Sequence, residues 1–170
     1  MAEQPYPVLW AHGLDAKPWG AKSTLLAKIA KEEGFAMDAT DFQGIRDPQV
    51  RVDMFMDACR DLDAPPILAG SSLGAYVSLM VSTKIKVRGL FLLAPAVILP
   101  GYGLKEIPLV TAPVAMVHGW KDELIPPESV FHYAEMTRAT LSMVDSDHRL
   151  STAHDQVCAF FRYFLNSMKD

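Results

Sequence analysis

The fold of this chain is decided by Ile67-Leu68-Ala69-Gly70-Ser71-Ser72-Leu73-Gly74-Ala75-Tyr76-Val77. The apolar residues after Pro65-Pro66 predict a buried parallel strand. The apolar positions then continue to Val81, which is too far for a strand and indicates a buried helix. Strand must therefore become helix across Gly70-Ser71-Ser72-Leu73-Gly74, which is a G-x-S-x-G sequence. Glycine suits both flanks, because the turn is tight and side chains there would collide.

A G-x-S-x-G sequence between a strand and a helix is typical of a nucleophile elbow. The serine of such an elbow sits on a sharp, strained turn, and its hydroxyl projects above the sheet. Ser72 holds the central position, while Ser71 is interpreted as a structural turn residue. The pentapeptide alone is weakly specific, since glycine and serine are common in loops. We predict that Ser72 is a nucleophile; the alternative is an ordinary serine in the turn that begins a helix.

Short apolar runs alternate with amphipathic segments along the rest of the chain. Further strands are predicted at 7–11, 35–40, 87–94, 113–117 and 139–144. Helices are predicted at about 23–33, about 49–62, from about 127, and at about 151–165. This alternation predicts an α/β fold, a doubly wound and mostly parallel sheet of about six strands with helices on both faces. At 170 residues, we expect one domain spanning residues 1–170.

The composition is that of an ordinary soluble globular protein, with 50% hydrophobic and 21% charged residues. The net charge of −4 and the absence of a basic patch argue against nucleic acid or an anionic membrane as a partner. Residues 1–5 carry an acid and do not resemble a signal peptide. Cys59 and Cys158 lie in helical patterns without metal-ligand spacing, which predicts buried thiols in a reducing compartment. We expect a cytoplasmic protein with no metal and no cofactor.

Chemically active side chains follow several of the predicted strands. Because function collects at the carboxyl ends of parallel strands, we compared the residues just past those ends. They include His12-Gly13-Leu14, Ser72, Asp122 and His148. A serine hydroxyl becomes a good nucleophile when an imidazole takes its proton, and a carboxylate fixes the tautomer of that imidazole. We therefore predict that Ser72 is the nucleophile, His148 the base and Asp122 the acid.

These residues resemble the α/β-hydrolase superfamily, and specifically its small bacterial esterase-like members without a cap domain. Four landmarks in order carry the resemblance: His12-Gly13, Gly70-Ser71-Ser72-Leu73-Gly74, His118-Gly119-Trp120-Lys121-Asp122 and Asp147-His148. The family's triad runs Ser…Asp…His along the chain, as here. The resemblance implies a serine hydrolase that cleaves a small ester or thioester through an acyl-enzyme. The alternatives are an acyltransferase or amidase using the same site, or a non-catalytic binding protein of this fold.

Other residues compete for two of these roles. His154 is the rival of His148, but it lies in a predicted helix and is expected to pack or to face solvent. Asp145 and Asp147 are rivals of Asp122, although neighbouring loop residues seldom face one another well. The remaining histidines are expected to be structural or solvated, namely His12, His118 and His132.

An oxyanion hole requires backbone N–H donors rather than particular side chains. Leu73, directly after the serine, is expected to supply one donor. Leu14, in the loop after the first strand, is expected to supply the other, since Gly13 permits a close approach there.

The substrate pocket is less defined by the sequence. Three aromatic residues could line an acyl or alcohol pocket or be ordinary core or rim residues, namely Trp120, Tyr76 and Tyr102. Arg46 and Arg51 could receive an anionic substrate, but a solvated position is the favoured interpretation. Residues 96–111 are too few for a helical lid of several elements. The expected partner is a small-molecule ester or thioester, and the sequence does not fix an oligomeric state.

Overall fold

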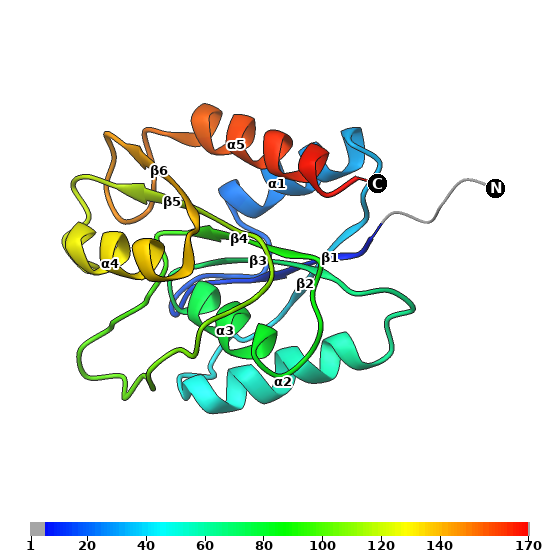
Figure 1. Cartoon of the computed structure of the whole chain (residues 1–170), viewed down its shortest axis with the longest axis horizontal. Coiled ribbons are helices and arrows are strands. Elements are labelled where there is room, and N and C mark those ends of the chain that lie inside the picture. The colour runs from blue at the N-terminus through cyan, green and yellow to red at the C-terminus, as the bar shows by residue number, and fades with distance from the viewer. Residues whose placement is uncertain (1–5, 170) are drawn as a thin grey trace.

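The computed structural model describes residues 6–169, which form one six-stranded sheet flanked by helices. The strands are β1 (Val8–Ala11), β2 (Met37–Thr40), β3 (Ile67–Ser71), β4 (Gly89–Leu93), β5 (Val114–Gly119) and β6 (Thr140–Val144). The helices are α1 (Ala21–Glu32), α2 (Pro48–Arg60), α3 (Leu73–Ser82), α4 (Pro127–Thr137) and α5 (His154–Ser167). The strand order is β2-β1-β3-β4-β5-β6, and every neighbouring pair is parallel. The predicted doubly wound sheet is therefore confirmed (Figure 1).

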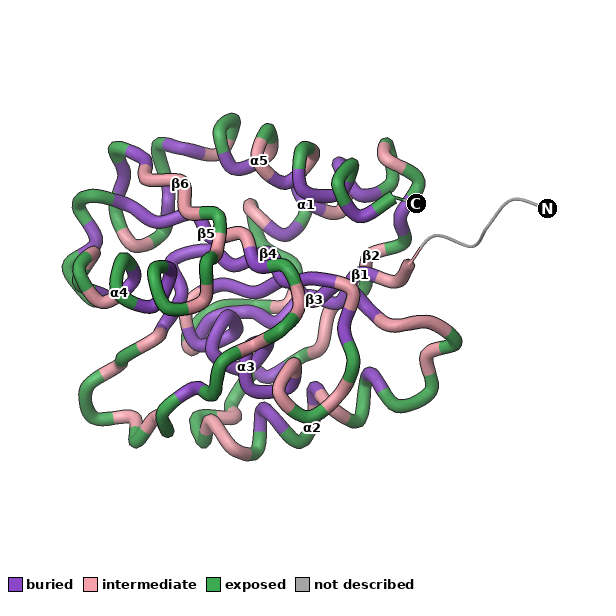
Figure 2. The backbone as a smooth tube through the Cα atoms, in the orientation of Figure 1, coloured by how far each residue is buried: buried purple, intermediate pink, exposed green. Residues whose placement is uncertain are grey.

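Helices cover both faces of the sheet. Helices α1 and α5 pack on one face, and α2, α3 and α4 pack on the other (Figure 1). Strands β1, β3 and β4 are buried along their whole length, whereas β6 at the sheet edge is only partly buried (Figure 2). The continuous apolar runs of the central strands follow from this double coverage. None of the helices within residues 6–169 has the length and apolarity needed to cross a membrane.

The observed element boundaries lie within three residues of the predicted ones, and hydrogen bonds explain the difference at two of them. The last helix begins at His154 rather than near Ser151. Ser151 instead donates both its backbone N–H and its hydroxyl to Asp147, which holds it in a turn ahead of the helix. Strand β2 begins at Met37 rather than at Phe35, because the Phe35 N–H donates to the Ala30 carbonyl at the end of α1.

The turn between β3 and α3 places Ser72 in a strained backbone conformation, with φ 54° and ψ −118°. Few residues with a side chain adopt a positive φ, and such strain persists only where the surroundings enforce it. Here the Ser72 N–H donates to the Leu93 carbonyl of β4 at 2.9 Å. The Ser72 carbonyl accepts N–H groups from Ala75, Tyr76 and Ala96. These backbone bonds hold the elbow in the conformation that the G-x-S-x-G sequence predicts.

Gly70 and Gly74 allow α3 to begin almost in contact with the two central strands. A Cβ atom on Gly74 would lie 1.9 Å from the carbonyl oxygen of Ala11, and one on Gly70 would lie 2.5 Å from the carbonyl oxygen of Gly74. Both neighbours are backbone atoms, which cannot rotate away as a side chain would. The spacing of the motif is therefore set by backbone packing as well as by turn geometry.

Gly74→Ala should destabilise the protein by at least about 1–3 kcal/mol, the usual cost of overpacking a core. The added methyl can fit only if α3 and β1 move apart. Urea unfolding measures the effect. Gly20→Ala is the matched control, because a Cβ at Gly20 meets nothing within 4 Å and its φ is −123°. Equal stabilities for the two variants would contradict the packing argument.

Candidate active site

Ser72, Asp122 and His148 meet at the carboxyl edge of the sheet, after β3, β5 and β6. The His148 Nε2 atom lies 2.9 Å from the Ser72 Oγ atom, and the His148 Nδ1 atom lies 2.7 Å from the Asp122 Oδ2 atom. Ser72 and His148 are half-buried, whereas Asp122 is buried. The structure therefore brings together the three side chains that the sequence singled out.

The hydrogen bonds of His148 define which nitrogen carries the proton. An ionised carboxylate can only accept hydrogen bonds, so the contact with Asp122 requires a proton on Nδ1. The Nε2 atom is then an acceptor and takes the hydrogen bond of the Ser72 hydroxyl. An imidazole held in this way is chemically able to remove the hydroxyl proton.

Asp122 is fixed by the turn that follows it. Its Oδ1 atom accepts the backbone N–H groups of Leu124 at 2.9 Å and of Ile125 at 2.8 Å. Burial alone would raise the pKa of the Asp122 carboxyl, but hydrogen bonds from His148, Ile125 and Leu124 together outweigh burial and lower that pKa. The carboxylate therefore stays ionised at neutral pH.

Gly119 lets the loops that carry Asp122 and His148 approach each other. A Cβ on Gly119 would lie 2.3 Å from the Ser146 carbonyl oxygen and 2.7 Å from that of Asp147. The Lys121 N–H donates to the same Ser146 carbonyl at 3.0 Å. The glycine of the H-G-x-x-D sequence thus joins the end of β5 to the loop after β6.

His118 has the structural position that was expected. It is fully buried, and its Nε2–H donates a hydrogen bond to the Ile125 carbonyl oxygen at 3.0 Å. Burial lowers the pKa of His118, which keeps the ring neutral beneath Asp122. The ring therefore supports the turn that presents the carboxylate.

The rival residues lie apart from Ser72. Asp145 forms a surface ion pair with Lys121 at 2.7 Å, and Asp147 accepts hydrogen bonds from Ser151. His154 is half-buried at the start of α5, and His132 is exposed on α4. Only His148 among the candidate bases contacts the serine within the described part of the chain.

The two expected oxyanion donors belong to segments that lie next to Ser72. Leu73 is the first residue of α3, and Leu14 is in the loop after β1. A Cβ on Gly13 would lie 3.6 Å from the Ser72 Cβ atom, so this loop runs against the serine. Within residues 6–169, neither the Leu14 N–H nor the Leu73 N–H donates to a protein acceptor. Both groups are free to bind an oxygen atom of a ligand.

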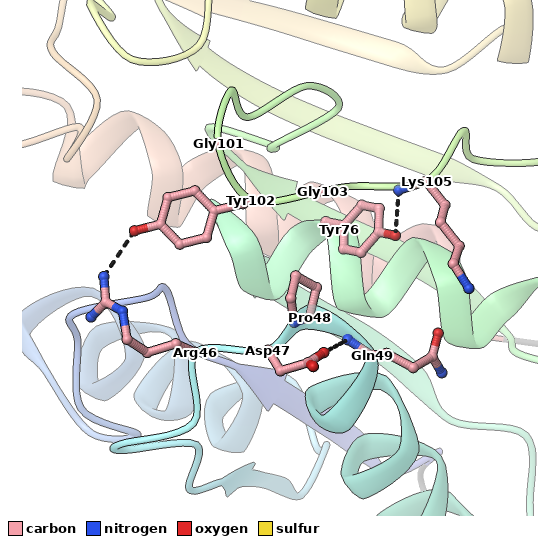
Figure 3. Close-up of a pocket in the computed structure, with 9 residues that line it drawn as sticks. All are labelled: Arg46, Asp47, Pro48, Gln49, Tyr76, Gly101, Tyr102, Gly103 and Lys105. Atoms are coloured by element: carbon pink, nitrogen blue, oxygen red, sulfur yellow. Dashed lines mark hydrogen bonds between the residues drawn. The ribbon is translucent and has the colours of Figure 1, made fainter.

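A pocket of about 410 Å³ opens one helical turn along α3 from Ser72. It is lined by Arg46, Asp47, Pro48, Gln49, Tyr76, Gly101, Tyr102, Gly103 and Lys105. Figure 3 shows Tyr102 reaching towards Arg46, whose Nη2 donates to the Tyr102 hydroxyl at 2.8 Å. The Tyr76 hydroxyl accepts the Lys105 backbone N–H at 3.1 Å. Two of the three expected aromatic residues therefore share one pocket.

The third aromatic residue, Trp120, does not line this pocket. It is 55% exposed at the end of β5, and its ring packs 5.8 Å from that of Phe131 on α4. Of the two interpretations left open for Trp120, a pocket residue or a rim aromatic, its exposure and its contact with α4 favour the rim position.

Both Arg46 and Arg51 were expected to be solvated, and this prediction is wrong for Arg51. Arg46 is exposed and pairs with Asp15 at 3.0 Å, as expected for a surface residue. Arg51 is fully buried, although it lies on a surface helix. Its guanidinium donates only to backbone carbonyl groups, several of them in the loop that contains Leu14. The sequence carried one signal for this burial, since Arg51 lies four residues before the buried Phe55 on the same helical face.

The two cysteines differ from each other. Cys59 is buried, and burial raises the pKa of its thiol to about 11. Cys158 is only half-buried on α5, so the prediction of two buried thiols is wrong for this residue. Its side chain lies at the boundary between the α5 core face and solvent. No group of three or more His, Cys, Asp or Glu side chains within residues 6–169 is arranged to hold a metal ion.

The chain belongs to the alpha/beta hydrolase family, whose model matches residues 8–167. A solved alpha/beta superfamily hydrolase from Xanthomonas campestris pv. campestris is similar at 31% identity and a TM-score of 0.89, covering 95% of this chain and 99% of that one. No curated protein matches the chain.

More distant structures share the fold. A monoacylglycerol lipase from Paleococcus ferrophilus is 17% identical, with a TM-score of 0.80 over 96% of this chain and 95% of that one. A serine hydrolase without a lid from Xanthomonas campestris is 22% identical, with a TM-score of 0.74 over 98% of this chain and 83% of that one.

The lowered pKa of Asp122 predicts a loss of stability in acid. A carboxyl whose folded pKa lies below its unfolded value of about 3.9 stabilises the fold above that value, and this contribution is lost as the pH falls through the folded pKa. The fall in unfolding free energy between about pH 5 and about pH 3 should therefore be smaller in Asp122→Asn than in the wild type. Urea titrations at the two pH values measure the unfolding free energy of each variant. Ser72→Ala, which removes no titrating group, should behave like the wild type; an unchanged fall in Asp122→Asn would contradict the assignment.

Proposed function

We propose that this protein is a serine hydrolase that cleaves a small ester or thioester through an acyl-enzyme. The observation that carries the proposal is the continuous chain of hydrogen bonds from the Ser72 hydroxyl through His148 to the buried Asp122 carboxylate. The strained elbow adds to it, because a positive φ at a serine is held in place by three surrounding backbone segments. Such strain clusters at functional sites.

The proposed reaction assigns one role to each group. The Ser72 Oγ atom attacks the carbonyl carbon of the substrate while His148 Nε2 removes the hydroxyl proton. Asp122 stabilises the resulting imidazolium. The N–H groups of Leu14 and Leu73 stabilise the negative oxygen of the tetrahedral intermediate. His148 then returns the proton to the departing alcohol or thiol, which leaves the acyl group on Ser72. A water molecule, deprotonated by the same imidazole, then attacks the acyl carbon. The bond to Oγ breaks as His148 returns that proton to Ser72, and the acid is released.

The family supports this proposal, since relatives of the same fold include a serine hydrolase without a lid and a monoacylglycerol lipase. Those similarities bear on the fold. The proposed chemistry rests on the side chains of this chain itself.

Ser72→Ala should abolish esterase activity, with a loss on the order of 10⁴ or more in kcat, while the melting temperature stays nearly unchanged. The wild type should also react with a fluorophosphonate probe at one site, Ser72, as shown by mass spectrometry of the labelled peptide. Ser71→Ala is the matched control, because Ser71 is buried at the end of β3 and the serine that His148 binds is Ser72. Retention of a tenth of the activity by Ser72→Ala would refute the proposal.

The segment between β4 and β5 bears on the size of the substrate. Residues 94–113 contain no helix and no strand and form a single loop (Figure 1). This loop contributes Gly101, Tyr102, Gly103 and Lys105 to the lining of the pocket. Ile98 and Leu109 within it are exposed to solvent. A site without a helical lid stays in contact with water and buries little of a long acyl chain.

The kcat/KM for p-nitrophenyl esters should therefore be highest for short acyl chains, from acetate to hexanoate. Each buried CH₂ contributes roughly 0.8 kcal/mol, so the preference ends where further carbons remain in water. No activation by micelles is expected, since there is no lid for an interface to open. A maximum at dodecanoyl or longer chains would contradict the open site while leaving the roles of Ser72 and His148 untouched.

A further inference from the structure

Arg51 is the largest fully buried side chain of the protein's described residues, and its surroundings are unusual for a charged group. Every guanidinium N–H group has a backbone carbonyl as its acceptor. The acceptors are the carbonyl groups of Ile45 (2.6 Å), His12 (3.1 Å), Gly13 (3.3 Å), Leu14 (3.1 Å) and Phe42 (3.4 Å). Arg51 forms no ion pair with any residue from 6 to 169. The side chain therefore binds the backbone of two loops, those after β1 and β2.

Burial of an unpaired charge works against the stability of the fold. Desolvation lowers the pKa of Arg51 to about 10, which still leaves the side chain charged at neutral pH. The Phe42 ring lies 5.2 Å from the guanidinium carbon and offers a cation–π contact. An apolar side chain of similar size would fill the same space without this penalty. Core packing alone does not explain a charged residue at this position. The hydrogen bonds of the guanidinium to the loop carbonyl groups do.

The bonds of Arg51 fix the direction of the peptide groups around Gly13. In a trans peptide the C=O and N–H bonds of one unit point in opposite directions. The Gly13 carbonyl and the Leu14 N–H belong to the same unit, so drawing that carbonyl towards α2 turns the Leu14 N–H away from α2. Gly13 lies against the Ser72 side chain. The bond to the Gly13 carbonyl thus controls the direction of the N–H next to the serine.

His12 holds the same carbonyl group from a second direction. Its Nε2 atom accepts the Phe42 N–H at 2.8 Å, which leaves the proton on Nδ1. That Nδ1–H donates to the Gly13 carbonyl at 2.8 Å. His12 is buried, and burial lowers its pKa, which keeps this tautomer neutral. The Gly13–Leu14 peptide is therefore held by two side chains that do not contact Ser72 themselves.

We propose that Arg51 is a positioning residue for the oxyanion hole: its bonds to the carbonyl groups of residues 12–14 aim the Leu14 N–H at the substrate oxygen beside Ser72. His12 assists through the Gly13 carbonyl. The inference rests on the proposed hydrolase function, since an oxyanion forms only if Ser72 attacks a carbonyl group. Arg51 itself touches no reacting atom.

The test compares an ester with the thionoester of the same acid and alcohol in Arg51→Met and Arg51→Lys. Sulfur is a weak hydrogen-bond acceptor, so the thionoester gains less from the N–H donors than the ester does. Loss of one oxyanion donor costs about 10²–10³ in kcat, and we expect the ester/thionoester ratio of kcat/KM to fall about tenfold or more in Arg51→Met. Arg51→Lys should give a smaller fall, because an ammonium cannot reproduce the planar fork. The ratio does not depend on the fraction of folded enzyme, so a destabilised preparation still reports on the site.

Val52→Ala is the matched control. Val52 is buried beside Arg51 on α2, and its loss should lower the melting temperature without changing the ester/thionoester ratio. If Arg51→Met does not fold, Arg51→Lys carries the test, with a fall of about threefold or more expected. An unchanged ratio in a folded Arg51 variant, or an equal change in Val52→Ala, would overturn the positioning role alone. An active Ser72→Ala would instead overturn the hydrolase function on which it rests.

Discussion

The carbonyl oxygen of Ala11 lies where any side chain at residue 74 would have to be, and much of the site depends on this contact. It brings the first turn of α3 against the end of β1 and so places the loop after β1 beside Ser72. The same closeness forces the chain to reverse sharply at Ser72, which accounts for the positive φ there. The nucleophile candidate, its backbone strain and the nearby N–H donors are consequences of one backbone-to-backbone packing.

The loops of the site are held by hydrogen bonds to backbone groups more than by side-chain pairs. Asp122 is fixed by two N–H groups of its own turn, and the loop after β6 is fixed by the carbonyl of Ser146. The loop after β1 is fixed by Arg51 and His12 through the carbonyl of Gly13. Each loop is therefore preorganised before any ligand arrives, and preorganised dipoles stabilise developing charge without a reorganisation cost.

The sheet, the elbow and the three joined side chains could be predicted from the sequence because their signals are local. Apolar runs define strands, glycine spacing defines the elbow, and the ends of parallel strands meet at one edge. For Arg51 the sequence offered only its spacing to Phe55, because a charged residue on an amphipathic helix is usually solvated and its acceptors are loop carbonyls outside the helix. The separation of Trp120 from Tyr76 and Tyr102 likewise depends on loop paths that no periodicity describes.

The strands that carry Ser72 and His148 differ in how well the sheet protects them. β6 has one neighbour in the sheet and is only partly buried, whereas β3 lies between two fully buried strands. His148 follows β6, and its loop is tied to α1 through the Lys22 ammonium bound to the Arg149 carbonyl at 2.8 Å. Edge elements with few buried contacts open at a lower free energy than the whole protein unfolds. The imidazole is therefore carried by an edge of the sheet, whereas the serine that it contacts is carried by the buried centre.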